Sequence, residues 1–455
     1  MSGLWMLQTA AERLDEVQTG LDTPLLARLM GLVGIATMLA IAFLMSNNKK
    51  RIDWRLVGMG LALQAAFGFI VLKTQAGQAL FRWIGTLVTG LLNFSAQGGK
   101  FIFGNLINNL VPVGPVANGA VDASAGVVAD VGAAFAFYVL PVIIFFSSLM
   151  SVLYYLNVMQ WIVKGIAWAV QKTLGTSGAE TLSASGNIFM GQTEAPLLIK
   201  PFIKTMTRSE INTVMVGGFA TVAGGVLAAY VGMLQGYFPD IASHLLAASV
   251  MNMPAGLLIS KMIVPETEVP ETRGTLHLSV EKTDSGVIEA AASGAATGVQ
   301  LALNVAGMLL AFIALVALLD FMLGWAGGFV GHAEWSVQYL LGLVMQPLVW
   351  LMGVPWQDAS TVGGLVGIKI GLNEFFAYIQ FAGDLGTSTL QPRSIIITTY
   401  ALLGFANFAS IAIQIGGIGG LAPERRSEIA GLGLRAMIGG NLAAFMSASL
   451  AGMLV

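Results

Sequence analysis

Apolar residues form long runs along most of this chain, and short polar segments separate them. Crossing the hydrocarbon core of a bilayer takes roughly 20 helical residues, and the longer runs meet that length. The pattern predicts eight transmembrane helices. They cover residues 29–46, 55–73, 133–156, 211–234, 242–264, 299–325, 395–420 and 430–454.

Other stretches are apolar but interrupted, and they predict elements that do not span. They lie at 77–110, 157–205 and 335–390. Within them, 162–174 and 337–354 have the amphipathic spacing of helices that lie along the membrane interface. Gly, Pro, Ser and Asn recur inside 178–204 and 357–388, which predicts two re-entrant hairpins. Non-helical backbone at that depth requires protein or a water-filled cavity around it.

The chain also carries an internal repeat. The segment GGFATVAGG at 217–225 parallels LGFANFASI at 403–411, and each follows a span, an interfacial helix and a hairpin. A four-residue match can arise by chance, but the shared order of five elements argues against that. Because an odd number of spans separates the two units, they should have opposite orientations, and such folds place substrate and ion sites where broken helices meet.

The predicted fold class is therefore an all-α polytopic membrane protein, with eight transmembrane helices, interfacial helices and two re-entrant hairpins in an inverted-topology repeat. The predicted organisation has five parts. They are a peripheral N-terminal helix (1–28), N-terminal scaffold spans with an interfacial helix (29–132), a first repeat (133–264), a cytoplasmic connector (265–298) and a second repeat (299–455).

Composition and charge narrow the function classes. Apolar residues make up 56% and charged residues 10% of the chain, and the net charge of −2 comes without a basic patch, so nucleic acid is not expected as a partner. Cysteine is absent, which excludes disulfides and thiolate metal sites. The three histidines are scattered, and no pairing of a nucleophile with a base is visible in a span, so neither an enzyme nor a cofactor is expected.

The distribution of Lys and Arg predicts the orientation. Lys49, Lys50, Arg51 and Arg55 follow the first span, and cytoplasmic loops carry an excess of such residues. The loop is therefore assigned to the cytoplasm and the N-terminus to the outside, in a multi-pass protein of the cell inner (plasma) membrane.

Two carboxylates interrupt otherwise apolar segments. Glu194 lies in GNIFMGQTEAP at 186–196, and Glu374 lies in LNEFFAY at 372–378. A charge near the bilayer centre costs roughly 2.5–3.5 kcal/mol, so it is expected to face a cavity, an ion or a substrate. Either one alone could instead cap a broken helix end. Lys369, in GIKIGLN, is expected to reach the interface or to pair with a carboxylate rather than to contact the substrate.

The amino-acid sequences of these segments resemble those of the concentrative nucleoside transporter family over roughly residues 30–455. The resemblance rests on ASGNIFMGQTEAPLLIKPF, MVGGFATVAGGVLAAYVGM, AASGAATGVQLALNVAGML, LNEFFAY and GFANFASIAIQIGGIG. It implies a homotrimer in the lipid bilayer whose protomers each import nucleosides of the uridine, cytidine and adenosine class. It further implies an elevator-type, alternating-access mechanism of secondary active symport with sodium, or with protons in some members.

The resemblance also implies the site residues. Those matching the nucleobase contacts are Gln192, Thr193, Glu194 and Val226, and those matching the ribose contacts are Glu374, Asn407 and Ser410, with Phe405 as a neighbouring aromatic. For the coupling sodium, the matching positions are Asn187 and Thr221 through side-chain oxygens, and Met190 and Val222 through backbone carbonyls. The family has Ser where this chain has Thr221, and both keep the hydroxyl that a hard cation prefers.

The chemistry agrees with this interpretation, because ribose hydroxyls pair well with a carboxylate and with amides, and an unpaired polar group costs about 1–3 kcal/mol. Proton coupling is the nearest alternative, in which Glu194 or Glu374 titrates and Asn187 and Thr221 only cap helix ends. A passive channel and an intramembrane enzyme are the alternatives from other classes. The sequence leaves open the preference between purine and pyrimidine nucleosides.

Overall fold

The computed structural model describes residues 23–108, 110–112, 116–117, 120–121, 128–130, 135–274, 284–387 and 390–455. The predicted peripheral helix at 1–28 lies almost wholly outside the described residues. Its last positions, from Leu25, already belong to the first described helix, α2 (Leu25–Leu44).

The described chain has seven helical segments long and apolar enough to cross a membrane, or eight if one bent pair counts as a single span. They confirm seven of the predicted spans. These are α2, α3 (Trp54–Lys73), η4 with α5 (Phe135–Val139 and Leu140–Tyr155), α8 with α9 (Arg208–Ala220 and Gly224–Leu234), α10 (Ile241–Ile263), α11 (Val287–Gly328) and η6 with α17 (Pro423–Arg425 and Arg426–Leu454). The eighth predicted span, 395–420, is broken into α15 (Pro392–Leu402) and α16 (Phe408–Leu421).

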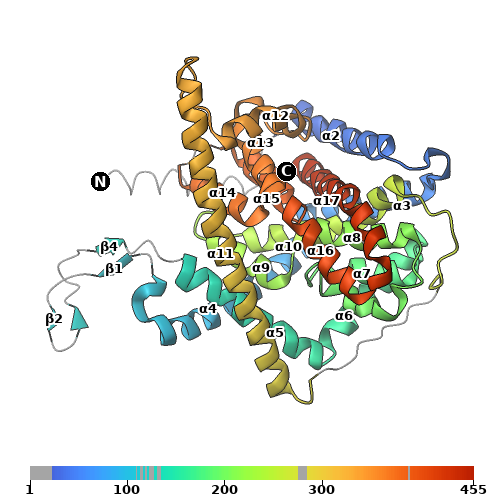
Figure 1. Cartoon of the computed structure of the whole chain (residues 1–455), viewed down its shortest axis with the longest axis horizontal. Helices are drawn as coiled ribbons and strands as arrows, with labels where there is room; N and C mark the ends of the chain where they lie inside the picture. The colour runs from blue at the N-terminus through green and yellow to red at the C-terminus, as the bar shows by residue number, and fades with distance from the viewer. Residues whose placement is uncertain are drawn as a thin grey trace.

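The long helix α11 departs from the predicted boundaries. It has 42 residues and begins at Val287, so the predicted connector at 265–298 is helical in its last part (Figure 1). The residues there are rich in alanine, which favours a helix without giving a hydrophobic signal. The helix packs closely on α5, since a Cβ at Gly298 would lie 2.7 Å from Cα of Ile144, and Ser148 donates to the carbonyl of Ala291 at 2.8 Å.

The interrupted stretches form shorter helices. The amphipathic ones are α4 (Gln75–Phe103), α6 (Val158–Leu174) and α12 (Val337–Leu351), and a short η2 (Gly104–Ile107) follows α4. The stretch predicted as the first hairpin, 178–204, contains α7 (Gly178–Gly186) and η5 (Ala195–Phe202), and the stretch predicted as the second, 357–388, contains α13 (Trp356–Gly371) and α14 (Glu374–Thr387). Helices α12 and α13 are the bent pair and meet at 118°, a bend that agrees with the predicted division into an interfacial helix and a hairpin arm.

Among the described residues, the regular structure is helical apart from a small strand region that the sequence pattern did not predict. Strand β1 (Leu110–Pro112) pairs antiparallel with β4 (Val128–Asp130), and β2 (Val116–Ala117) pairs with β3 (Ala120–Val121). Figure 1 shows these strands projecting to one side of the helical body. Each strand has two or three residues, which is too short to produce a detectable alternation of apolar and polar positions.

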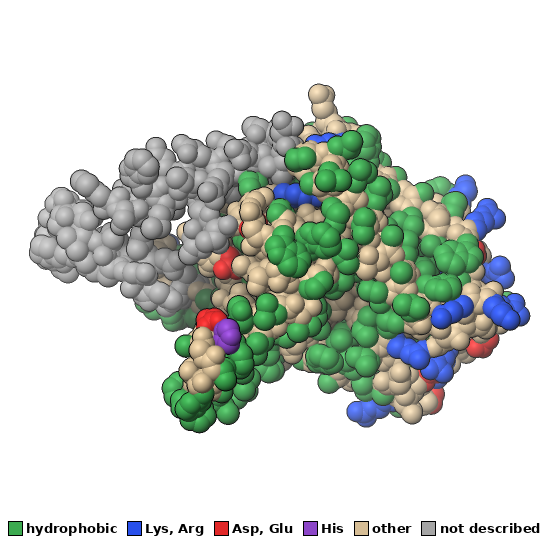
Figure 2. All heavy atoms as spheres, turned by 90° about the horizontal axis from the view of Figure 1, so that it is seen from above, with side chains coloured by type: hydrophobic (Ala, Val, Ile, Leu, Met, Phe, Trp, Pro, Cys, Tyr) green, Lys and Arg blue, Asp and Glu red, His purple; other side chains and the backbone are tan. Residues whose placement is uncertain are grey.

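The surface separates apolar from charged regions. In Figure 2, apolar side chains cover much of the visible face, while Lys and Arg side chains gather mainly at one end. Helix α11 carries large exposed apolar side chains, among them Leu310, Phe321 and Trp325. Helices α8, α10 and α17, by contrast, are mostly buried at the centre. The central helices therefore position the polar residues described next.

Candidate functional site

Two broken helices cross at the centre of the molecule. Helix α8 ends at Ala220 and α15 ends at Leu402, and the backbone N–H of Phe405 donates to the carbonyl of Thr221 at 3.2 Å. Gly404 has φ of +118°, and a Cβ there would lie 2.7 Å from the carbonyl oxygen of Phe219. Only glycine combines this backbone conformation with so close an approach, so the two breaks lie directly against each other.

Each break has an asparagine that satisfies a freed carbonyl. Asn252 on α10 donates to the carbonyl of Ala220 at 2.7 Å, and Asn441 on α17 donates to that of Ala406 at 2.9 Å. Ala220 and Ala406 hold the same place in the two matching segments GFAT and GFAN. A helix that stops inside the protein leaves such carbonyls without amide partners, and here the two halves meet the need in the same way.

Residues predicted to contact the ribose converge at the start of α14. Glu374 is 5% exposed, its Oε1 accepts from the Tyr230 hydroxyl at 3.1 Å, and its Oε2 accepts from Nδ2 of Asn407 at 2.8 Å. Oδ1 of Asn407 accepts from the N–H of Ser410 at 2.9 Å and caps α16. Tyr230, whose ring stacks on that of Tyr378, is a contact that the sequence interpretation missed. A tyrosine in an apolar span is the only signal that pointed to it.

The prediction for Lys369 was wrong. Its side chain is fully buried, and Nζ donates to the carbonyls of Ala401 at 2.8 Å and Leu403 at 3.3 Å. The ammonium also lies 5.5 Å from the ring centroid of Phe445. Among the ion pairs of the described residues, none includes Lys369. The physical reason is the end of α15, where unsatisfied carbonyls and the helix dipole attract a cation.

Hairpin 178–204 reaches the same region through Gln192. Its Nε2 donates to Oγ of Ser410 at 3.2 Å, and its Oε1 accepts from Nε2 of Gln414 at 3.0 Å. Gln414 also donates to the carbonyl of Met215 at 3.0 Å, and Thr193 packs beside Gly417 of α16. The sequence interpretation missed Gln414, although a glutamine inside the apolar α16 marked it.

The remaining predicted base contacts lie around this point. Glu194 is exposed, and its Oε2 accepts from the N–H of Gly191 at 3.0 Å, so it closes its own turn. This contact corresponds to the capping alternative for that carboxylate, whereas Glu374 is buried among polar partners. Val226 is buried in the first turn of α9, and Phe405 is partly buried at the crossing.

The residues predicted to bind sodium include an amide that has no partner among the described residues. Asn187 is fully buried at the end of α7, and neither Oδ1 nor Nδ2 has a hydrogen-bond partner among the described residues. Thr221, which donates to the carbonyl of Gly217 at 2.9 Å, keeps its lone pairs, and Met190 and Val222 are buried nearby in the chain. A buried polar group without a partner costs about 1–3 kcal/mol, so this amide oxygen fits a hard cation that prefers oxygen ligands.

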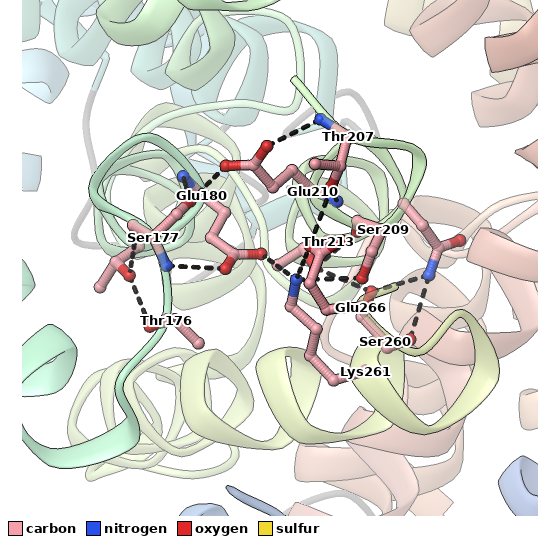
Figure 3. Close-up of polar contacts among 12 residues, drawn as sticks. Thr176, Ser177, Glu180, Thr207, Ser209, Glu210, Thr213, Ser260, Lys261 and Glu266 are labelled. Atoms are coloured by element: carbon pink, nitrogen blue, oxygen red, sulfur yellow. Dashed lines mark hydrogen bonds and ion pairs between the residues drawn. The ribbon is translucent and has the colours of Figure 1, made fainter. Parts of the chain in front are cut away.

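A second polar cluster lies at the start of segment 178–204, at the far end of α7 from Asn187. Ser177 and Thr207 begin α7 and α8, each in a capping box, and the Ser177 hydroxyl also donates to Glu210 (Figure 3). Nζ of Lys261 pairs with Glu180 at 2.8 Å and with Glu266 at 3.1 Å. Because these contacts join α7, α8 and α10, they set the direction in which the hairpin tip points.

Comparisons with known proteins identify relatives over almost the whole chain. Three family profiles match, described as Na+ dependent nucleoside transporter N-terminus (residues 33–106), nucleoside recognition (136–236) and Na+ dependent nucleoside transporter C-terminus (244–452). The uncharacterized transporter YutK of Bacillus subtilis is 46% identical over 94% of this chain and 99% of its own. The sodium/nucleoside cotransporter 1 of Mus musculus is 39% identical over 99% of this chain and 66% of its own.

Solved structures show the same fold. The transporter CNTnw in an inward-facing, substrate-bound state is similar with a TM-score of 0.82 and 40% identity, over 94% of this chain and 98% of that one. A CNTnw variant in an outward-facing state is similar with a TM-score of 0.84 and 40% identity, over 95% and 98%.

Proposed function

This chain belongs to the concentrative, Na+-dependent nucleoside transporter family, and on that premise we propose that it is a sodium-coupled symporter that imports nucleosides. Membership makes it a transporter with several membrane spans and not an enzyme. CNTnw has been solved in inward-facing and outward-facing states, which supports alternating access, and we extend this to an elevator-type movement here.

The observation that carries the proposal is the buried polar arrangement around Glu374. Its carboxylate accepts from the amide of Asn407, and Asn407 in turn accepts from the backbone N–H of Ser410. Gln192, from the other hairpin, donates to the Ser410 hydroxyl. A ribose offers hydroxyls that can replace the Tyr230 and Asn407 donors at the carboxylate. We propose that Glu374, Asn407 and Ser410 bind the ribose with Phe405 beside it, and that Gln192, Thr193, Glu194 and Val226 address the base.

For the coupling ion we propose a sodium site at the end of α7. Asn187 would supply its amide oxygen and Thr221 its hydroxyl, and Met190 and Val222 would add carbonyl oxygens. The amide of Asn187, which has no hydrogen-bond partner in the described part of the chain, supports this assignment. A sodium ion that moves with the membrane field adds about 2.3 kcal/mol per 100 mV to its concentration gradient, which is enough for accumulation.

We propose that residues 133–264 and 299–455 are inverted repeats, with 29–132 contributing scaffold spans. The matched asparagine contacts to Ala220 and Ala406 support the repeat. Lys and Arg gather mainly at one end, which supports placing that end in the cytoplasm of a plasma-membrane protein with its N-terminus outside (Figure 2). A homotrimer is part of the proposal, and the exposed apolar face of α11 is available for contact with lipid or another copy.

Uptake into proteoliposomes tests the function directly. Labelled uridine and adenosine are supplied under a sodium gradient, with choline replacing sodium, and under a proton gradient alone. Accumulation that requires sodium is the expected result. Accumulation driven only by protons would favour the alternative in which a carboxylate titrates, and no uptake under any gradient would contradict nucleoside transport itself.

A further inference from the structure

Lys369 is a buried charge to which the proposed transport function gives no role. It lies in α13, one helical turn before Asn373, and its side chain is fully buried in the second half of the chain. Burying an ammonium is costly unless other groups replace its water. The carbonyls of Ala401 and Leu403 do this at 2.8 and 3.3 Å, where α15 stops.

The first repeat (133–264) also has two carbonyls near a helix break that accept hydrogen bonds from buried side chains, but those side chains are uncharged. The spacing between Asn187 and Thr221 equals that between Asn373 and Asn407, which aligns Ser183 with Lys369. The same offset pairs the carbonyl of Met215 with that of Ala401 and the carbonyl of Gly217 with that of Leu403. Both carbonyls of the first repeat accept from neutral donors. Nε2 of Gln414 donates to Met215 at 3.0 Å, and Oγ1 of Thr221 donates to Gly217 at 2.9 Å.

The hairpin asparagines differ in the corresponding way. Oδ1 of Asn373 accepts from the N–H of Phe376 at 2.8 Å and is therefore occupied. Oδ1 of Asn187 has no partner among the described residues. In the repeat that contains the Lys369 ammonium, the amide oxygen of Asn373 is thus bonded within the chain. In the other repeat, the amide oxygen of Asn187 is available to a cation.

We propose that Lys369 is a positioning residue that supplies, as part of the chain, the positive charge that the first break obtains from the coupling ion. Its ammonium holds the end of α15, and through Leu403 and the turn at Gly404 it fixes Asn407, which donates to Glu374. The ribose contacts of the second repeat (299–455) therefore keep their geometry at all times. The first repeat (133–264) reaches its binding geometry only when an ion is bound. This inference rests on the proposed function.

Replacement of Lys369 tests the inference in the full-length protein in proteoliposomes. Lys369→Ala removes the charge and leaves space for a small cation, and Lys369→Gln keeps a neutral donor of similar length. The KM of uridine is expected to rise by about tenfold or more in both variants, with a smaller change in the maximal rate, because the fault lies in the shape of the binding site. Ser183→Ala, at the matching position, is the control and should leave the KM of uridine unchanged.

A soluble cation separates this role from a merely structural one. Methylammonium, or sodium at higher concentration, should restore part of the uptake by Lys369→Ala, and neither should increase uptake by the wild type at saturating sodium. A wild-type KM in Lys369→Gln would overturn the inference, because the charge would then not be needed. Loss of uptake in Lys369→Ala that neither cation restores would also overturn it.

The two proposals fail in different ways. If the wild type shows no sodium-driven uptake, the proposed function is wrong. If the wild type transports uridine and both Lys369 variants match it, only the role of Lys369 is wrong. If Lys369→Ala does not fold, Lys369→Gln alone decides through its KM.

Discussion

The segments around Asn187 and Asn373 occupy matching positions in the sequence and differ in how their polar groups are satisfied. At the second tip, both oxygens of Glu374 and the ammonium of Lys369 have partners inside the chain. At the first tip, Asn187 has none among the described residues and Glu194 is exposed. The difference teaches that the carboxylate and the ammonium of the second tip are satisfied within the protein, while the Asn187 amide of the first tip is left for a ligand.

The largest expected effect on uptake comes from a change at Glu374, in the second hairpin. Glu374→Gln should lower uptake at limiting uridine by about 100-fold or more, since each hydrogen bond to a charged group contributes roughly 1.5–3 kcal/mol. Uptake kinetics in proteoliposomes measure this, and size-exclusion chromatography checks that assembly is intact. Glu194→Gln is the matched change at the other tip and should cost less than about tenfold, because its carboxylate caps its own turn. Normal transport by Glu374→Gln would contradict the ribose assignment.

The next effect concerns the ion. Asn187→Ala should raise the sodium concentration for half-maximal uptake by about tenfold, which corresponds to the loss of roughly 1.4 kcal/mol from one oxygen ligand. The matched variant is Asn373→Ala, whose oxygen is already bonded to Phe376. It should leave the sodium dependence unchanged even if stability falls. Equal shifts in both variants would show that the two tips do not differ as described.

The crossing of the two breaks gives a smaller effect, on stability. Gly404→Ala should destabilise the protein by about 1–3 kcal/mol, because an alanine is strained at this φ and would press on the carbonyl of Phe219. Gly416→Ala on α16, where a Cβ meets nothing within 4 Å, should change stability by less than about 0.5 kcal/mol. Thermal unfolding in detergent distinguishes them, and similar melting temperatures would mean that the crossing tolerates a side chain.

The smallest expected effect is on stability, and it concerns the matched asparagine contacts that the two repeats share. Asn252→Ala and Asn441→Ala should each cost about 1 kcal/mol, a usual value for a hydrogen bond between membrane helices. The same thermal measurement compares them. A large loss in one variant and none in the other would show that the matched contacts to Ala220 and Ala406 do not carry equal weight.

Much of the fold could be predicted from the sequence because apolar runs and their interruptions report directly on membrane depth. The hairpin containing Glu374 is an example, since a charge in an apolar segment needs polar surroundings. Helix 287–298 could not be predicted in this way, because its small residues carry little hydrophobic signal. The strands between 110 and 130 were too short to give a pattern.

The site was less predictable, because its contacts join residues far apart in the chain. Tyr230 bonds to Glu374, and Gln414 bonds to Gln192 and Met215, which no spacing along the sequence indicates. Lys369 shows the same limit, since the carbonyls that hold it become available only where α15 ends. Family resemblance supplied Gln192, Asn407 and Ser410, and their roles as ligands remain predictions.

The crossing at Gly404 has a consequence for spectroscopy. The bond from Phe405 to Thr221 and the two bonds of Gln414 fasten the broken helices together. At saturating sodium, a pair of spin labels placed one on each broken helix should therefore report a single distance, the same with and without nucleoside. A pair joining α11 to either hairpin is where a second distance would emerge.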